Sequence, residues 1–140
     1  MSKISTILLV EDDQLDAMDI KRSLDKLNVF YKLVVAKNGE EALDILKGVH
    51  QTKLEDLPDI ILIDINMPRM NGLEFLHILR ETPDWKGIKC FVITTSDEKV
   101  DRETARQLGV SGYIVKPFKI NNTSSIDSFN LMIDLMNMKA

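Results

Sequence analysis

Residues 59–64 read Asp59-Ile60-Ile61-Leu62-Ile63-Asp64, a short apolar run enclosed by two acids. The run has the length of a buried parallel strand and is too short for a helix. A second run of this kind, Ile7–Val10, ends in Glu11-Asp12-Asp13. If both strands belong to one parallel sheet, their carboxyl ends share an edge and four carboxylates converge there. Two charges about 4 Å apart repel by roughly 4 kcal/mol at an effective dielectric of about 20, so the cluster indicates a bound cation or a reactive carboxyl.

The remainder of the chain alternates between strand and helix patterns. This alternation implies right-handed crossovers, and therefore a parallel sheet that is covered by helices on both faces. The long polar segment Gly48–Leu57 interrupts the pattern and is expected to form a surface loop. The predicted strands are Ile7–Val10, Leu33–Ala36, Ile60–Ile63, Phe91–Thr94 and Tyr113–Val115.

Each strand is followed by a helical pattern with an apolar face. Asp13 is a favoured N-cap residue and is expected to open the first helix, Leu15–Leu27. Asn38-Gly39 opens the second helix, and Gly109 ends the fourth. The predicted apolar positions are Ala17, Ile20, Leu24 and Leu27 in the first helix, those of Glu40–Leu46 in the second, Leu73, Leu76 and Leu79 in the third, Val100, Ala105 and Leu108 in the fourth, and Ile126, Phe129, Ile133 and Met136 in the last.

Composition narrows the class of protein. A chain of 140 residues suffices for one domain with a real core. The net charge of -4, without a Lys/Arg stripe, argues against nucleic-acid binding. No apolar stretch approaches the roughly 18 residues of a membrane span. Met1-Ser2-Lys3 runs straight into a predicted strand, so we expect no signal peptide. The single cysteine, Cys90, excludes an internal disulfide, is expected to be structural, and fits a cytoplasmic protein.

Polar residues follow the other predicted strands as well. Asp64 is followed by Asn66, the fourth strand ends in Thr94, and the fifth is followed by Lys116. Carboxylate oxygens without His or Cys favour Mg²⁺ or Mn²⁺ over zinc. A lysine and a hydroxyl beside such a cation would stabilise a phosphoryl group, and Asp64 would then be a nucleophile that accepts it. Alternatively these acids are turn residues and helix caps, which explains Asp13 well but explains four separate strand ends poorly.

With these residues in place, the chain resembles the receiver domain of two-component response regulators from about Ile4 to Met136. The resemblance implies a flavodoxin-like (βα)5 fold, a doubly wound α/β arrangement with a five-stranded parallel sheet in strand order 2-1-3-4-5. Five segments carry it in the expected order. They are Val10-Glu11-Asp12-Asp13, Ala36–Leu43, Asp64-Ile65-Asn66-Met67-Pro68-Arg69-Met70-Asn71-Gly72, Ile93-Thr94 and Gly112-Tyr113-Ile114-Val115-Lys116-Pro117-Phe118.

The resemblance also implies a role for each site residue. Asp64 would be the phosphoacceptor. Glu11 and Asp12 would help to bind Mg²⁺, with Asp12 the more direct ligand, and the backbone carbonyl of Asn66 would be a further ligand.

The remaining roles concern the bound phosphoryl group and the response to it. Thr94 would bind the phosphoryl group and move inward on activation, and burial of Tyr113 would be coupled to that movement. Lys116 would pair with the phosphoryl oxygens, and the Lys116–Pro117 bond would be cis.

Partners follow from the same resemblance. A sensor histidine kinase or a phosphotransfer protein would donate the phosphoryl group. Only 22 residues follow Phe118, so we expect a single receiver domain over 1–140, with a core at about 4–136 and no separate output domain. The last helix is apolar over most of its girth, which is consistent either with a homodimer or partner surface shared with Thr95–Leu108 or with simple docking on the sheet. Gly48–Leu57 and Glu81–Trp85 resemble single-domain regulators associated with phytochromes.

Three other classes compete with this interpretation. A pseudo-receiver would be an interaction module without phosphorylation, which the complete set of Asp12, Asp64, Thr94 and Lys116 disfavours. A flavodoxin-like FMN binder would require a phosphate-binding loop after the first strand, where three acids stand instead. A phosphatase of the haloacid dehalogenase type would place an Asp-x-Asp pair after the first strand.

Overall fold

The computed structural model describes residues 5–26, 30–52, 54 and 56–116. The predicted last helix and the Lys116–Pro117 bond lie outside these residues, so both stay predictions. Among the described helices, none is long and apolar enough to cross a membrane. The elements are β1 (Ser5–Val10), α1 (Gln14–Asp25), β2 (Tyr31–Ala36), α2 (Gly39–Lys47), β3 (Ile60–Ile63), α3 (Gly72–Glu81), β4 (Lys89–Thr94), α4 (Lys99–Gln107) and β5 (Gly112–Val115).

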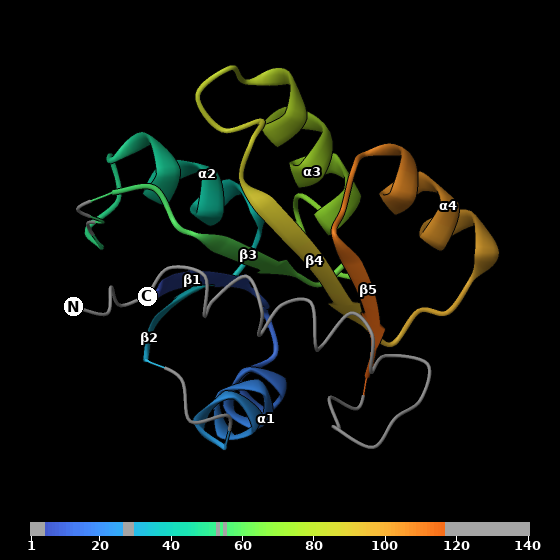
Figure 1. Ribbon diagram of the computed structural model, residues 1–140, viewed down its shortest axis with the longest axis horizontal. Helices are drawn as coiled ribbons and strands as arrows, with labels where there is room; N and C mark the ends of the chain where they lie inside the picture. Colours follow the sequence, from blue (N-terminus) through green and yellow to red (C-terminus); the bar gives the residue numbers. More distant parts are fainter. Residues whose placement is uncertain (1–4, 27–29, 53, 55, 117–140) are drawn as a thin grey trace.

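The five strands form one parallel sheet in the order β2-β1-β3-β4-β5, which confirms the predicted topology. Figure 1 shows α2, α3 and α4 on one face of the sheet and α1 on the other. Each predicted strand is present, and β1, β2, β4 and β5 begin one or two residues earlier than the apolar runs indicate. In this order β2 lies on one side of β1 and β3 on the other, so β1 and β3 are neighbours. Because the strands are parallel, the carboxyl ends of β1 and β3 lie side by side.

Two cores pack against the two faces of the sheet. Leu8 and Val10 face the core beneath α2 and α3, whereas Ile7 and Leu9 face the core beneath α1. All four residues of β3 are buried, because helices cover this central strand on both sides. A strand of this kind shows a continuous apolar run in the sequence and no alternation of polar and apolar residues.

Side-chain caps start α1, α2 and α3, each of which follows a strand of the sheet. Asp13 accepts hydrogen bonds from the backbone amides of Leu15 and Asp16, which confirms its predicted role as the N-cap of α1. Asn38 caps α2 through the amide of Glu41. Asn71 and Glu74 form a reciprocal capping box at the start of α3, in which the side chain of each accepts from the backbone amide of the other. Short, well-capped connections therefore hold the loops at the carboxyl edge of the sheet.

The predicted apolar face of α4 is wrong in one respect. Val100 is 72% exposed, and Ala105 is the one buried residue of α4 within the described chain. Five residues turn an α-helix by about 140° beyond a full circle, so Val100 and Ala105 do not share a face. Leu108 is the C-cap of the helix and packs partly against the core, and Gly109 follows with φ +74°, as a helix-terminating glycine does.

Arg80 organises the amino edge of the sheet, opposite the predicted site. Its guanidinium donates hydrogen bonds to the carbonyls of Lys86 and Ile88 before β4, at 2.9 Å each. It also donates to the carbonyls of Leu108 at 2.7 Å and Gly109 at 3.2 Å, after α4. One side chain of α3 thus joins two separate loops through their backbones.

Candidate functional site

The acids predicted from the sequence meet at the carboxyl ends of β1 and β3. The amide of Glu11 donates to the carbonyl of Ala36 at 2.9 Å, and the amide of Asp64 donates to the carbonyl of Val10 at 3.0 Å. These bonds extend the sheet one residue past each strand. Both acids therefore stand on rigid backbone, and Glu11 and Asp64 are 2% and 5% exposed.

Glu11, Asp12 and Asp64 form an acidic cluster. Each contributes a carboxylate oxygen, and these atoms all lie within 4.8 Å of one another. Glu11 and Asp64 are buried, while Asp12 is exposed, so the cluster opens to solvent on the side of Asp12. Hard carboxylate oxygens at this spacing suit Mg²⁺ or Mn²⁺, which fits the metals predicted from the sequence.

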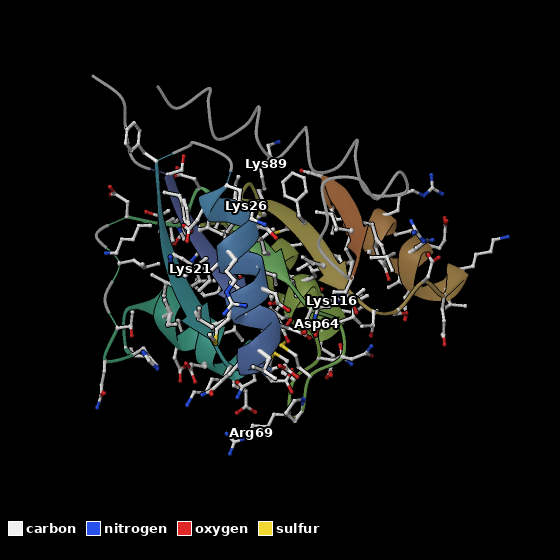
Figure 2. All side chains as sticks on the ribbon, turned by 90° about the horizontal axis from the view of Figure 1, so that it is seen from below. Lys21, Lys26, Asp64, Arg69, Lys89 and Lys116 are labelled. Atoms are coloured by element: carbon white, nitrogen blue, oxygen red, sulfur yellow. The ribbon has the colours of Figure 1, made fainter. Side chains whose placement is uncertain are left out.

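Lys116 reaches into this cluster from the end of β5. Its ammonium nitrogen lies 2.6 Å from Glu11 Oε1, 2.8 Å from Asp16 Oδ2 and 3.1 Å from Asp64 Oδ2. Figure 2 shows Lys116 and Asp64 side by side, with Lys89 at the opposite edge of the sheet. The Lys116 side chain is only 9% exposed, and its backbone amide donates to the carbonyl of Thr94 at 2.7 Å.

The electrostatics of the site leave an excess of negative charge. Burial raises the pKa of Glu11 to about 7, against the hydrogen bond from Lys116, which lowers it. Burial also acts to lower the pKa of Lys116, but hydrogen bonds to Asp16 and Glu11 and the charge of Asp64 outweigh it and raise that pKa. Lys116 is thus a charged ammonium that faces several carboxylates. A divalent cation would supply the charge that one lysine cannot, so the donor set fits such an ion.

The loop after Asp64 depends on a close approach of backbones. The amide of Asn66 donates to Asp64 Oδ1 at 3.2 Å. A Cβ atom at Gly72 would lie 2.3 Å from the carbonyl oxygen of Asp64, so only glycine fits there. Arg69 adopts the left-handed conformation with φ 66°, and its side chain contacts Glu40 at 3.4 Å on the surface. The loop is therefore compact, and Gly72 sets the position of Asp64.

Thr94 and Tyr113 are joined through the backbone of Ser96. Thr94 is fully buried at the end of β4, and its hydroxyl accepts a hydrogen bond from the Ser96 amide at 3.3 Å. Tyr113 is 8% exposed and donates to the Ser96 carbonyl at 2.9 Å. The guanidinium of Arg102 lies 4.7 Å from the centre of the Tyr113 ring, and it also bonds to Asp97. One loop residue therefore connects both predicted switch residues.

Sequence reasoning missed two participants, Asp16 and Ser96. Asp16 lies in the first turn of α1, and helical side chains lean toward the helix N-terminus, so an acid at this position points back over the strand end. The position of Asp16 in the first turn therefore indicates from the sequence that its carboxylate lies near the site. Ser96 meets Thr94 and Tyr113 through its amide and carbonyl, and backbone groups leave no mark in a sequence. Its hydroxyl also donates to Asp101 in the first turn of α4 at 2.6 Å. Tyr113 stands near the start of β5 and reaches the loop after β4 through its hydroxyl, whereas the other predicted site residues lie at the carboxyl edge.

Comparison with known proteins gives a consistent match. A family model described as the response regulator receiver domain matches residues 7–126. The response regulator Rcp1 of Synechocystis is 31% identical over 110 residues, which are 79% of this chain and 75% of that protein. A chemotaxis protein CheY homolog of Campylobacter jejuni is 36% identical over 112 residues, which are 80% of this chain and 81% of that protein.

Solved structures agree with these relatives. The Mn²⁺-bound form of Rcp1 matches with a TM-score of 0.77 and 29% identity, covering 91% of this chain and 94% of that one. The phosphorylated cyanobacterial phytochrome response regulator RcpA matches with a TM-score of 0.80 and 28% identity, covering 99% and 97%. These matches confirm the resemblance that the sequence motifs indicated, including the likeness to phytochrome-associated regulators.

Proposed function

The chain belongs to the response regulator receiver domain family of two-component signalling, and we propose that Asp64 is its phosphoacceptor. Proteins of this family are signalling proteins that interact with histidine kinases or phosphotransfer proteins. The observation that carries the proposal is the arrangement around Asp64. A buried carboxylate stands 3.1 Å from a buried ammonium and beside two further acids.

We propose that Glu11, Asp12, Asp64 and the backbone carbonyl of Asn66 hold Mg²⁺ or Mn²⁺. The spacing of the carboxylates and their excess over Lys116 support this assignment. The likeness to Rcp1, of which a Mn²⁺-bound form has been solved, supports it as well. When bound, the ion would neutralise charge on the phosphoryl oxygens during transfer.

In the proposed transfer, a carboxylate oxygen of Asp64 attacks the phosphorus of a phosphohistidine or a small phosphodonor. A new P–O bond forms, the P–N bond to the histidine breaks, and its electron pair stays on the leaving imidazole. Lys116 donates to a phosphoryl oxygen, and the Thr94 hydroxyl donates to another. Water later hydrolyses the acyl phosphate, so the chain catalyses only its own phosphorylation and dephosphorylation.

The response would pass through Ser96. If the Thr94 hydroxyl turns to the phosphoryl group, it gives up the hydrogen bond from the Ser96 amide, and Ser96 also holds Tyr113. The loop after β4 would then shift between two populations, and α4 and β5 would present a different surface to a partner. We propose that the chain acts in this way as one receiver domain over 1–140. The predicted homodimer through the last helix stays a prediction, because that helix is outside the described residues.

The test is an intact-mass measurement with Mg²⁺ and acetyl phosphate. We expect wild type to gain the mass of one phosphoryl group and Asp64→Asn to gain none. Asp59→Asn is the matched control, since Asp59 precedes the same strand and should leave labelling unchanged. Stoichiometric labelling of Asp64→Asn would contradict the assignment. A folded wild type that takes no phosphoryl group would favour the pseudo-receiver instead.

A further inference from the structure

Lys116 pairs with one acid, Asp16, that is not part of the acidic cluster. An ammonium group has three N–H donors, and the three carboxylates of Glu11, Asp16 and Asp64 accept from Lys116. Two of these acceptors, Glu11 and Asp64, also belong to the acidic cluster. Among the described partners of Lys116, Asp16 alone stands outside that cluster. It reaches Lys116 from the first turn of α1, on a different element from the other two.

We propose that Asp16 is a positioning residue, which keeps the ammonium of Lys116 in place while Glu11 and Asp64 bind a metal ion, and which thereby raises the metal affinity of the site. Neither the family match nor the sequence motifs assign a role to this position. This role rests on the proposed metal site at Glu11, Asp12 and Asp64, and it depends on the phosphoacceptor assignment only for what Lys116 then does to a phosphoryl group.

Lys116 and a metal ion would compete for the same two carboxylates. Glu11 and Asp64 accept from Lys116 at 2.6 and 3.1 Å, so a cation that binds these carboxylates competes with the ammonium for the same negative charge. The cation also repels the ammonium, which is confined because its side chain is only 9% exposed. The affinity for the metal is therefore lower unless a further carboxylate accepts a hydrogen bond from Lys116.

Asp16 is such an acceptor for Lys116. Its side chain is 39% exposed, so it stays partly hydrated while it accepts from Lys116 at 2.8 Å. Asp16 also lies in the first turn of α1, where the helix dipole attracts negative charge. Without this carboxylate, the ammonium would bind Glu11 and Asp64 alone and would compete more strongly with the metal.

The coupling between Asp16 and Lys116 can be measured by isothermal titration with MgCl₂, without phosphorylation. We expect Asp16→Asn to weaken Mg²⁺ binding roughly three- to tenfold, in the range of coupling between contacting charged groups. Asp19→Asn is the matched control, because it removes the same charge from the same helix at a side chain that is 68% exposed and pairs with Arg22. Asp16→Glu, which restores the charge, should recover part of the affinity.

The same substitutions in a Lys116→Met background complete a double-mutant cycle. There Asp16→Asn should have no larger effect than Asp19→Asn, because the ammonium through which Asp16 acts is gone. An equal loss of affinity from Asp16→Asn in both backgrounds would overturn the proposal, as would equal effects of Asp16→Asn and Asp19→Asn in the wild-type background. The second comparison decides the matter even if circular dichroism shows that the Lys116 variants do not fold.

Failure of the proposed function would look different. If acetyl phosphate labelled neither wild type nor any variant, yet Asp16→Asn still weakened Mg²⁺ binding through Lys116, the phosphoacceptor assignment would fall and the role of Asp16 would stand.

Discussion

The phenol of Tyr113 donates a hydrogen bond to the backbone carbonyl of Ser96, two residues after Thr94, at 2.9 Å. This bond joins the edge strand β5 to the loop that follows β4. Burial raises the pKa of Tyr113, against the lowering effect of that hydrogen bond, so the phenol stays a donor at neutral pH. The loop is therefore held in place from two sides, by Thr94 and by Tyr113.

Tyr113→Phe should loosen this loop. Loss of the hydrogen bond should lower the free energy of unfolding by about 0.5–1.5 kcal/mol, and amide exchange at Ser96 and its neighbours should accelerate. Tyr31→Phe is the control, because its hydroxyl bonds to Asp25 on the far side of the sheet. Unchanged exchange at Ser96 in Tyr113→Phe would show that Tyr113 does not hold the loop.

Gly72→Ala should displace Asp64. The added methyl group would lie 2.3 Å from the Asp64 carbonyl oxygen and 2.7 Å from a methyl carbon of Ile63. We expect a loss of about 1–3 kcal/mol in the free energy of unfolding and a drop of roughly ten- to hundredfold in the rate of labelling by acetyl phosphate. Gly87→Ala should change neither quantity, because nothing lies within 4 Å of a Cβ atom there. Equal behaviour of the two variants in denaturant titrations would contradict this account.

Arg69 should tolerate asparagine and resist valine. Its φ of 66° is a conformation that Asn adopts readily and that β-branched residues avoid. Its ion pair with Glu40 joins two exposed side chains and contributes little. Arg69→Val should therefore lower the free energy of unfolding by about 1–2 kcal/mol, and with it the midpoint of thermal unfolding. Arg69→Asn should leave both quantities nearly unchanged. If both variants lost the same stability, the ion pair and not the backbone would be the cause.

Glu11 should make stability depend on pH in metal-free buffer. Its pKa of about 7 in the folded chain lies above the ordinary value of 4.5, so the folded state binds more protons in that interval. The contribution of Glu11 is therefore fully present below pH 4.5 and is lost as the pH rises through 7. The stability of wild type relative to Glu11→Gln should fall on the order of 1–3 kcal/mol across this range. Parallel pH profiles from urea titrations of the two proteins would contradict the assignment.

Much of the fold could be predicted because its signals are local. The apolar run Ile60–Ile63 is long enough for a buried strand and too short for a helix. Asp13 and Asn38 mark the starts of the two helices that they cap. The same patterns place the acids, Thr94 and Lys116 at strand ends. Topology then brings these ends together, because parallel strands share one carboxyl edge.

What could not be predicted depends on side-chain direction and on the backbone. The sequence predicts Val100 on a buried face with Ala105, but Val100 is exposed because five residues do not return to the same stripe of a helix. The polar sequence of α4 offers few other apolar residues from which to place that stripe. The contact between Asp16 and Lys116 spans 100 positions, and only the assembled sheet reveals it. Arg69 gives no sign in the sequence that its backbone is left-handed.

Arg80 has a mechanical consequence for α4. The carbonyls of Leu108 and Gly109, just past the end of the helix, are tied to Arg80, whereas no side chain within the described residues caps the start of the helix at Glu98. The end of α4 is thus fixed to Arg80 at the amino edge of the sheet, whereas its first turn is joined to the loop of Ser96 by a hydrogen bond of 2.6 Å from the Ser96 hydroxyl to Asp101. A shift of that loop would therefore move the first turn of α4 and rotate the helix about its other end, where the contacts with Arg80 act as the hinge. Amide exchange that slows steadily from Lys99 toward Gln107 would be the sign of such a hinge, and uniform exchange along the helix would speak against it.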